Sequence, residues 1–255
     1  TGVNLINWNS RWFGIHAALE YYFWFKSRIQ WYAEKGIVTL GGVGIFIPKE
    51  ILIILDGWDE KCLTEDAKLG VDCTIRGYKF KVISDEKYAT SEEVPTSLFC
   101  FVKQRTRWIQ GYLQIVGSGN WLKLSFIKQI QLLSLFLFPI IQSILLLWFV
   151  FSLFMFRHLP MLISMISFLP LFILLFQIVI HLAGLIEMLK SRKQLKMAPF
   201  AIAQYSIGYL PYQIVISFCA LRALTRSIVR NYTWEKTTHL NVHRNGAQQI
   251  ISQDI

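Results

Sequence analysis

The feature that constrains this chain most is a stretch of 25 residues, Leu132 to Phe156, without a single charged side chain. As an α-helix it would be about 37 Å long, which exceeds the ~30 Å hydrocarbon core of a bilayer. After a short turn at Arg157–Pro160, Met161 to Ile186 adds 26 residues whose sole ionisable side chain is His181. Two such runs in succession predict a hairpin of membrane-spanning helices.

A third uncharged run covers Ala198 to Leu221, but Gly208 and Pro211 interrupt it. Four Lys and Arg side chains lie within residues 190–196, and such clusters are typical of cytoplasmic loops. Three further arginines follow the run at helical spacing: Arg222, Arg226 and Arg230. A full crossing would place these arginines on the opposite side, so we expect a broken or re-entrant third span and a cytoplasmic N-terminal half.

The net charge of +10 does not indicate a nucleic-acid-binding protein, because of where the charges lie. Residues 1–120 hold 14 Lys and Arg against 13 Asp and Glu, so the excess belongs to the apolar second half, where it flanks the predicted spans. With 54% hydrophobic and 16% charged residues, the composition also excludes a disordered chain. The four cysteines form no CxxC pair and have no His at metal-ligand spacing, so neither a zinc site nor a disulfide framework is expected.

Helical and strand-like segments alternate in residues 1–120, which predicts an α/β domain. We expect helices over 11–34, from Pro48 to about residue 56, over 65–76 and over 98–116, with strands over 37–47 and 79–84. Thr64 would cap the third of these helices. Beyond this domain, we expect an interfacial helix at 121–131, an all-α transmembrane region at 132–230 with spans near 132–156, 161–186 and 198–221, and a tail at 231–255.

Two groups of residues could carry chemistry. Gln104, Arg107 and Trp108 share one helix face, where a guanidinium fits phosphate oxygens, an amide bonds hydroxyls and an indole stacks on a sugar ring. The alternative is a helix that anchors itself at the membrane surface through Arg and Trp. Glu65 and Asp66 follow Thr64 at a helix N-terminus, where the helix dipole favours ionised carboxylates that accept protons. The alternative here is the ordinary acidity of a first helical turn.

Taken together and in order, these groups resemble the motifs of the membrane-embedded family 2 glycosyltransferases, which include cellulose, chitin and hyaluronan synthases and bacterial relatives. The segments that carry the resemblance are Gly41-Gly42-Val43-Gly44, Gly57-Trp58-Asp59-Glu60, Thr64-Glu65-Asp66, Gln104-Arg105-Thr106-Arg107-Trp108 and the later Trp234-Glu235-Lys236-Thr237-Thr238-His239. The resemblance implies part of a GT-A type α/β domain, followed by membrane helices.

The resemblance also implies a role for each matching residue. Asp66 would be the general base that takes the proton of the acceptor hydroxyl, and Thr64 and Glu65 would position it. Gln104 and Arg107 would hold the donor diphosphate. Two parts would line the acceptor site: Trp108, stacked on the terminal sugar, and the Gly41–Gly42 loop, whose missing side chains permit close approach.

One departure from the family pattern is the missing donor half. The nucleotide-binding strands and the Asp-x-Asp carboxylates should precede the glycine-rich loop, yet only 40 residues stand there and no Asp-x-Asp occurs. We therefore expect this sequence to be the C-terminal part of a longer enzyme and inactive alone. In the intact enzyme we expect Mg²⁺ or Mn²⁺, whose ligands this chain does not contain.

The leading hypothesis is an inverting glycosyltransferase that uses a nucleotide sugar, in particular a UDP-sugar, to extend a polysaccharide at the cytoplasmic face of the plasma membrane. One alternative is a non-processive enzyme that glycosylates a lipid acceptor. Another, from a different class, is a non-catalytic transporter or scaffold protein, which explains the spans but not the paired motifs. Membrane lipid is an expected partner, whereas nucleic acid is not.

Overall fold

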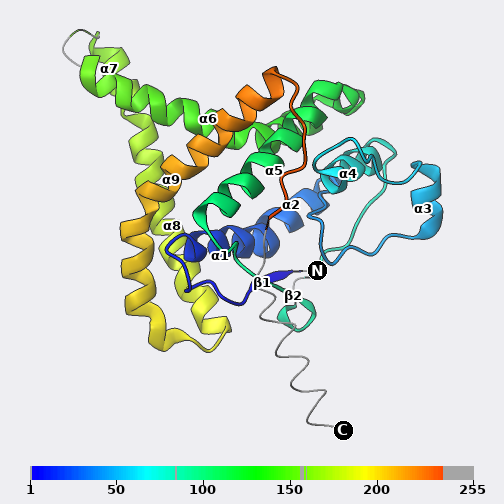
Figure 1. Ribbon diagram of the computed structural model, residues 1–255, viewed down its shortest axis with the longest axis horizontal. Coiled ribbons are helices and arrows are strands. Elements are labelled where there is room, and N and C mark those ends of the chain that lie inside the picture. Colours follow the sequence, from blue (N-terminus) through cyan, green and yellow to red (C-terminus); the bar gives the residue numbers. More distant parts are fainter. Residues whose placement is uncertain (1, 84, 156–157, 159, 238–255) are drawn as a thin grey trace.

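The structure is a computed structural model that describes residues 2–83, 85–155, 158 and 160–237 (Figure 1). The elements in its N-terminal half are β1 (Val3–Leu5), α1 (Gly14–Phe23), the π-helical turn η1 (Trp24–Arg28), α2 (Ile29–Glu34), α3 (Lys49–Ile54), α4 (Glu65–Ile75), η2 (Glu86–Tyr88), β2 (Thr90–Glu92) and α5 (Leu98–Ser118). The remaining elements are η3 (Asn120–Lys123), α6 (Phe126–Met155), α7 (Met161–Ser167), α8 (Leu169–Ser191), η4 (Leu195–Met197) and α9 (Ala198–Ile228).

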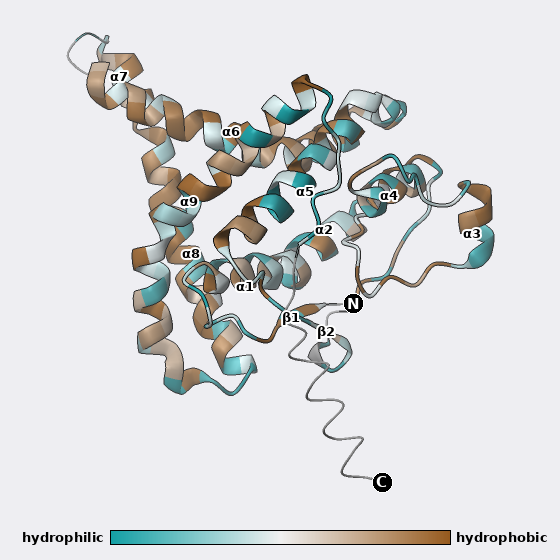
Figure 2. Ribbon diagram, in the orientation of Figure 1, coloured by the Kyte–Doolittle hydropathy of each residue, from teal (hydrophilic) through white to brown (hydrophobic). Residues whose placement is uncertain are grey.

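Within the described residues, three helical segments are long and apolar enough to cross a membrane, as the sequence predicts: Phe126–Met155, Met161–Ser191 and Leu195–Ile228. Figure 2 shows the apolar residues spread along α6, α7 and α8, and many of these side chains point outward. Phe154, for example, is 81% exposed and Phe172 is 65% exposed. Outward apolar faces of this extent fit a membrane environment.

The expected break in the third span is wrong, because α9 is one continuous helix with Pro211 in its interior. Gly208 does not break the helix either. A Cβ at this position would lie 2.6 Å from His16 Nε2, so the glycine permits the close contact between α9 and α1. Neighbouring helices commonly accommodate a proline inside a membrane-type helix in this way.

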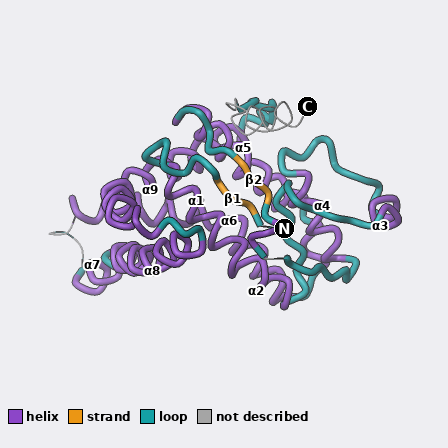
Figure 3. The backbone as a smooth tube through the Cα atoms, turned by 90° about the horizontal axis from the view of Figure 1, so that it is seen from below, coloured by secondary structure: helices purple, strands orange, loops and turns teal. Residues whose placement is uncertain are grey.

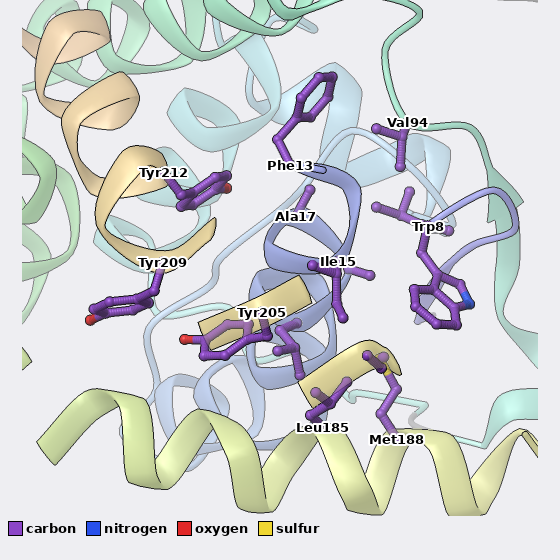
Figure 4. Packing of buried hydrophobic residues seen from close by; sticks show 14 of the residues in the cluster. Trp8, Phe13, Ile15, Ala17, Val94, Leu185, Met188, Tyr205, Tyr209 and Tyr212 are labelled. Carbon is purple, nitrogen blue, oxygen red and sulfur yellow. The ribbon is translucent and has the colours of Figure 1, made fainter. Parts of the chain in front are cut away.

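α9 is the helix around which the others pack. It contacts α5, α6, α8 and α1, and nearly half of its most apolar stretch is buried (Figure 1). Figure 4 shows Tyr212 of α9 lying toward α1 and Tyr205 close to Leu185 of α8. The rings of Tyr205 and Tyr212 both contact His16 of α1. Tyr209 faces α8, where its hydroxyl donates to Gln177. This core joins the membrane-type helices α8 and α9 to α1, the first helix of the N-terminal half.

The N-terminal half contains much less sheet than an α/β domain predicts. Among the described residues, β1 and β2 form a two-stranded parallel sheet in which Val3 pairs with Thr90 and Leu5 with Glu92. In the view of Figure 3 this sheet lies between the membrane-type helices α8 and α9 on one side and α3 and α4 on the other. The α/β GT-A expectation is therefore met only in part.

The two expected strands, 37–47 and the described part of 79–84, are wrong because neither segment pairs with another strand. Residues near Val38 pack against α4 instead. The Val38 N–H donates to Thr74 Oγ1 at 2.8 Å, and Val38 is buried with Leu69 and Cys73 of α4. The buried Val38 N–H thus has a helix side chain as its hydrogen-bond partner instead of a neighbouring strand.

The expected helices are present, with shifted ends. The predicted helix at 11–34 is interrupted by the π-helical turn η1, and those at 65–76 and 98–116 correspond to α4 and α5. Pro48 directly precedes α3, as expected. The interfacial helix expected at 121–131 does not exist as a separate element, because η3 covers its first residues and α6 already begins at Phe126.

Gly70→Ala should lower the thermal unfolding midpoint by several degrees. The new Cβ would lie 2.6 Å from the carbonyl oxygen of Val38, a backbone atom that cannot rotate away. Overpacking of this kind costs about 1–3 kcal/mol. The matched control is Gly117→Ala in α5, where nothing lies within 4 Å of the new Cβ. Equal midpoints for the two variants in detergent-solubilised protein would contradict the close packing of α4 on residues 37–40.

Candidate active site

The two sequence motifs meet where the N-terminus of α4 approaches the middle of α5. Thr64 is 5% exposed and lies directly against Gly111, where any Cβ would overlap the threonine side chain. The expected capping role of Thr64 is wrong for its side chain, which makes no capping hydrogen bond to α4. Its hydroxyl instead faces the Cys62 sulfur at 4.0 Å. Thr64 therefore fills the space that a glycine on α5 leaves open.

Gln114 fastens the residues before α4 to α5. Its side-chain oxygen accepts a hydrogen bond from the Leu63 N–H at 2.9 Å, and its side-chain nitrogen donates to the Lys61 carbonyl at 3.0 Å. Sequence reasoning missed this residue. The available signal was its spacing, since Arg107, Gly111 and Gln114 stand at i, i+4 and i+7 and thus share one face of α5.

The site combines half-buried carboxylates with a half-buried guanidinium. Burial raises the pKa of Asp66, and the charge of Glu65 raises it further, whereas the Ala67 N–H and Arg107 act in the opposite direction. Burial likewise lowers the pKa of Arg107, against the effect of Glu65 and Asp66. The structure thus brings the three charged groups of the two motifs into one electrostatic environment.

The glycine-rich loop reaches the same place. Gly42 has a φ of +74°, which favours glycine, and a Cβ there would lie 3.3 Å from Asp66 Oδ2. The loop backbone therefore passes directly beside the candidate base. Gly41 lies against Trp24 and Phe25, which are 3.8 and 3.9 Å from its ideal Cβ position.

Trp108 and Gln104 lie half-buried on α5, one turn apart. The Trp108 ring contacts Tyr21 of α1 edge-on, with ring centroids 6.3 Å apart. Arg105 covers the Trp108 ring at 4.7 Å. These aromatic and cationic contacts hold the indole between α1 and α5.

The segment after α9 returns to this site. Trp234 lies under the Arg107 guanidinium, 3.9 Å from ring centroid to Cζ. Glu235 forms a two-bond ion pair with Arg222 of α9, both distances being 2.7 Å, and this contact holds the pKa of Glu235 below its ordinary value. In Figure 1 the segment runs from the end of α9 along α5. Thr238 and His239 of the tail motif lie outside the described residues.

A second contact ties the same segment to α5. The Gln110 side chain accepts a hydrogen bond from Arg226 Nε at 2.9 Å and donates to the Asn231 carbonyl at 3.0 Å. Gln110 is 1% exposed, so this bridge is part of the interior. Sequence reasoning noted the tail but could not place it on α5.

The residues that the structure describes contain no preformed metal cluster. Within the described residues, no group of three or more His, Cys, Asp and Glu side chains could hold a metal ion. The described residues therefore contain no preformed cluster of three such ligands for Mg²⁺ or Mn²⁺.

Comparison with known proteins identifies the family of these motifs. Residues 1–183 match the family model described as "Glycosyl transferase family group 2". The chain is 28% identical over 235 residues to "Probable glycosyltransferase YdaM" of Bacillus subtilis, covering 85% of this chain and 54% of that protein. It is also 28% identical over 141 residues to "Beta-monoglucosyldiacylglycerol synthase" of Synechocystis, covering 55% of this chain and 28% of that protein. The chain thus spans about half the length of the first relative and less than a third of the length of the second. No solved structure matches the chain.

Asp66→Asn should raise the thermal unfolding midpoint at neutral pH. Because burial raises the pKa of Asp66 in the folded state, its ionised form opposes folding above the ordinary aspartate pKa. The gain should therefore shrink as the pH falls toward the ordinary aspartate pKa of about 3.9 and vanish below it, where the carboxyl becomes protonated in both states. The control is Asp72→Asn on the same helix, which removes an ion pair to Lys68 and should give no gain. A lower midpoint for Asp66→Asn at neutral pH would contradict the burial.

Glu235→Gln should release the segment that covers Arg107. The substitution weakens two charge-assisted hydrogen bonds to Arg222, and the loss of even one costs about 1.5 kcal/mol. Cleavage by chymotrypsin after Tyr232 or Trp234 should then become roughly tenfold faster. Lys236→Gln, at an exposed neighbouring position, is the control and should be cleaved like the parent. Unchanged cleavage of Glu235→Gln would show that the ion pair does not hold the segment.

Proposed function

Because this chain belongs to glycosyl transferase family group 2, we propose that it transfers a sugar from a nucleotide-sugar donor, in particular a UDP-sugar, to an acceptor hydroxyl at a membrane surface. One observation carries the proposal. The carboxylates at the N-terminus of α4 share an electrostatic environment with Arg107 of α5 and lie beside the Gly42 loop. The transfer is an inverting one, in which the acceptor oxygen displaces the diphosphate directly.

Asp66 is the general base of this reaction. As the acceptor oxygen bonds to the anomeric carbon, its proton passes to the Asp66 carboxylate and the bond to the diphosphate breaks. The burial that raises the pKa of Asp66 makes the carboxylate a stronger base near neutral pH. Thr64, packed on Gly111, and Glu65 position it.

Gln104 and Arg107 bind the diphosphate and stabilise the charge that develops on it. Trp234 occupies the face of the Arg107 guanidinium, but the N–H groups point outward in the guanidinium plane. This stacking therefore leaves donors for phosphate oxygens. Trp108 stacks on the acceptor sugar, and the Gly41–Gly42 backbone lines the acceptor site.

Mg²⁺ or Mn²⁺ at the diphosphate also belongs to the proposal, since the motifs resemble those of metal-dependent enzymes. Bound there, the cation would neutralise charge on the leaving group. The described residues contain no preformed cluster of three metal ligands, and no step above is routed through the cation.

The first candidate acceptor is a growing polysaccharide. The Gln-x-x-Arg-Trp pattern and its half-buried Trp108 support it, because a flat indole suits the apolar face of a sugar. The enzyme then works at the cytoplasmic face of the plasma membrane as a multi-pass protein, which the apolar segments support.

A lipid acceptor is the second candidate, and one specific observation favours it. A relative is named for the glucosylation of diacylglycerol. The three apolar helices also provide a surface at which a lipid hydroxyl could approach the site. A non-catalytic transporter is not favoured, because the charged groups of α4 and α5 would then have no use.

In the intact enzyme in membranes, Asp66→Asn should reduce the rate of sugar transfer by about 10²–10⁴. UDP release is measured with UDP-glucose, UDP-galactose and UDP-N-acetylglucosamine. The acceptors are phosphatidylcholine vesicles that contain diacylglycerol, or soluble cello- and chito-oligosaccharides, so that the same assay separates the two acceptor classes. Because the pKa of Asp66 is raised, parent activity should fall on acidification at a pH above the ordinary aspartate value of about 3.9.

Asp72→Asn on the same helix is the matched control and should retain activity, since Asp72 pairs with Lys68 and has no role in the proposed reaction. Transfer by Asp66→Asn at the parent rate would refute the base assignment. Absence of UDP release from the parent enzyme with every donor and acceptor would favour the non-catalytic alternative.

A further inference from the structure

Arg105 lies between two aromatic rings on α5. Its Cζ is 4.7 Å from the centroid of the Trp108 ring and 4.9 Å from that of Phe101. The three residues stand at i, i+4 and i+7, so they form one stripe along the helix. This stripe lies next to, but apart from, the face that carries Arg107, Gly111 and Gln114 toward α4.

α1 covers the stripe at three points. Glu20 forms an ion pair with Arg105, with 2.7 Å between Oε2 and Nη2. Phe13, just before α1, packs on Phe101 with ring centroids 5.0 Å apart. Tyr21 meets the edge of Trp108. The ion pair thus stands between two aromatic contacts, one of which is the candidate acceptor platform.

Packing of α1 on α5 does not by itself require an ion pair between Glu20 and Arg105. The Arg105 side chain is 13% exposed, so its charge is taken largely out of water at a substantial desolvation cost. Apolar side chains of similar size would pack α1 on α5 without that cost. A planar guanidinium does what an aliphatic side chain cannot: it stacks flat on an indole while its edge is fixed by a carboxylate.

We propose that Glu20 and Arg105 are positioning residues for acceptor binding: the carboxylate fixes the guanidinium, and the guanidinium fixes the plane of the Trp108 indole. This inference rests on the proposed acceptor role of Trp108. It adds an element that the motif does not contain, since Glu20 lies on α1. Because α1 also packs against α8 and α9, the acceptor platform is set by the same helix that contacts the membrane-type helices.

The test uses the intact enzyme and the donor and acceptor that give UDP release in the panel above. Arg105→Lys keeps the positive charge but removes the planar guanidinium that lies over the Trp108 ring. It should raise the acceptor KM roughly tenfold, with a donor KM changed less than about twofold. Glu20→Gln should act in the same direction. Glu20→Gln leaves a buried guanidinium unpaired. If this single variant does not fold, the double variant Glu20→Gln/Arg105→Met takes its place in the assay.

The matched control is Glu34→Gln, an exposed carboxylate on α2, which should leave both KM values at those of the parent. A merely structural ion pair predicts that Arg105→Lys binds acceptor normally and that any loss appears in the unfolding midpoint. That result would overturn the inference.

Trp108→Ala separates this inference from the proposed function. If Trp108→Ala raises the acceptor KM but Arg105→Lys and the double variant do not, the positioning role is wrong and the proposed function stands. If Trp108→Ala leaves the acceptor KM unchanged, the acceptor role of Trp108 fails and the positioning role fails with it.

Discussion

The close contact between Thr64 and Gly111 is the constraint on which the site depends. Any larger residue at position 111 would displace Thr64 and, with it, the first turn of α4 that carries Glu65 and Asp66. Gln114 holds the same approach through two hydrogen bonds to the backbone before α4. Gly70 of α4 likewise permits a close contact, here with the backbone of Val38, from which the chain continues into the Gly41–Gly42 loop. Two glycines thus fix the spacing between a carboxylate, a guanidinium and a backbone loop.

The membrane-type helices are part of this arrangement rather than an appendage to it. α9 packs along α5, and the chain after it returns to cover Arg107 with Trp234. Two of the three arginines after the third apolar run, which suggested a membrane-flanking stripe, have specific partners: Arg222 and Arg226 bind Glu235, and Arg226 also binds Gln110. Interior hydrogen bonds and ion pairs therefore connect the end of the apolar region to the helix that carries the Gln-x-x-Arg-Trp motif.

The sequence predicted what depends on local pattern. Long uncharged runs identified the membrane-type helices, and the spacing of Gln104, Arg107 and Trp108 placed them on one helix. The predictions that failed concern features that depend on contacts between segments distant in the sequence. Pro211 and Gly208 predict a break locally, but α1 packs against Gly208 and the helix continues. Residues 37–47 have the composition of a strand, yet Thr74 of α4 satisfies the Val38 N–H. The spacing of Gln114 places it on the face of Arg107 and Gly111, but its hydrogen bonds to the backbone before α4 and the Glu20–Arg105 pair were not predictable, because each joins residues that only packing brings together.

The most direct test of the central claim, that α4 and α5 form one donor and acceptor site, is an experimental structure of the intact enzyme with UDP and Mg²⁺ bound. We expect diphosphate oxygens within about 3 Å of Gln104 and Arg107 nitrogens, and the Asp66 carboxylate facing the space beside the Trp108 ring. A diphosphate bound elsewhere, with Asp66 and Arg107 turned away from it, would contradict the account.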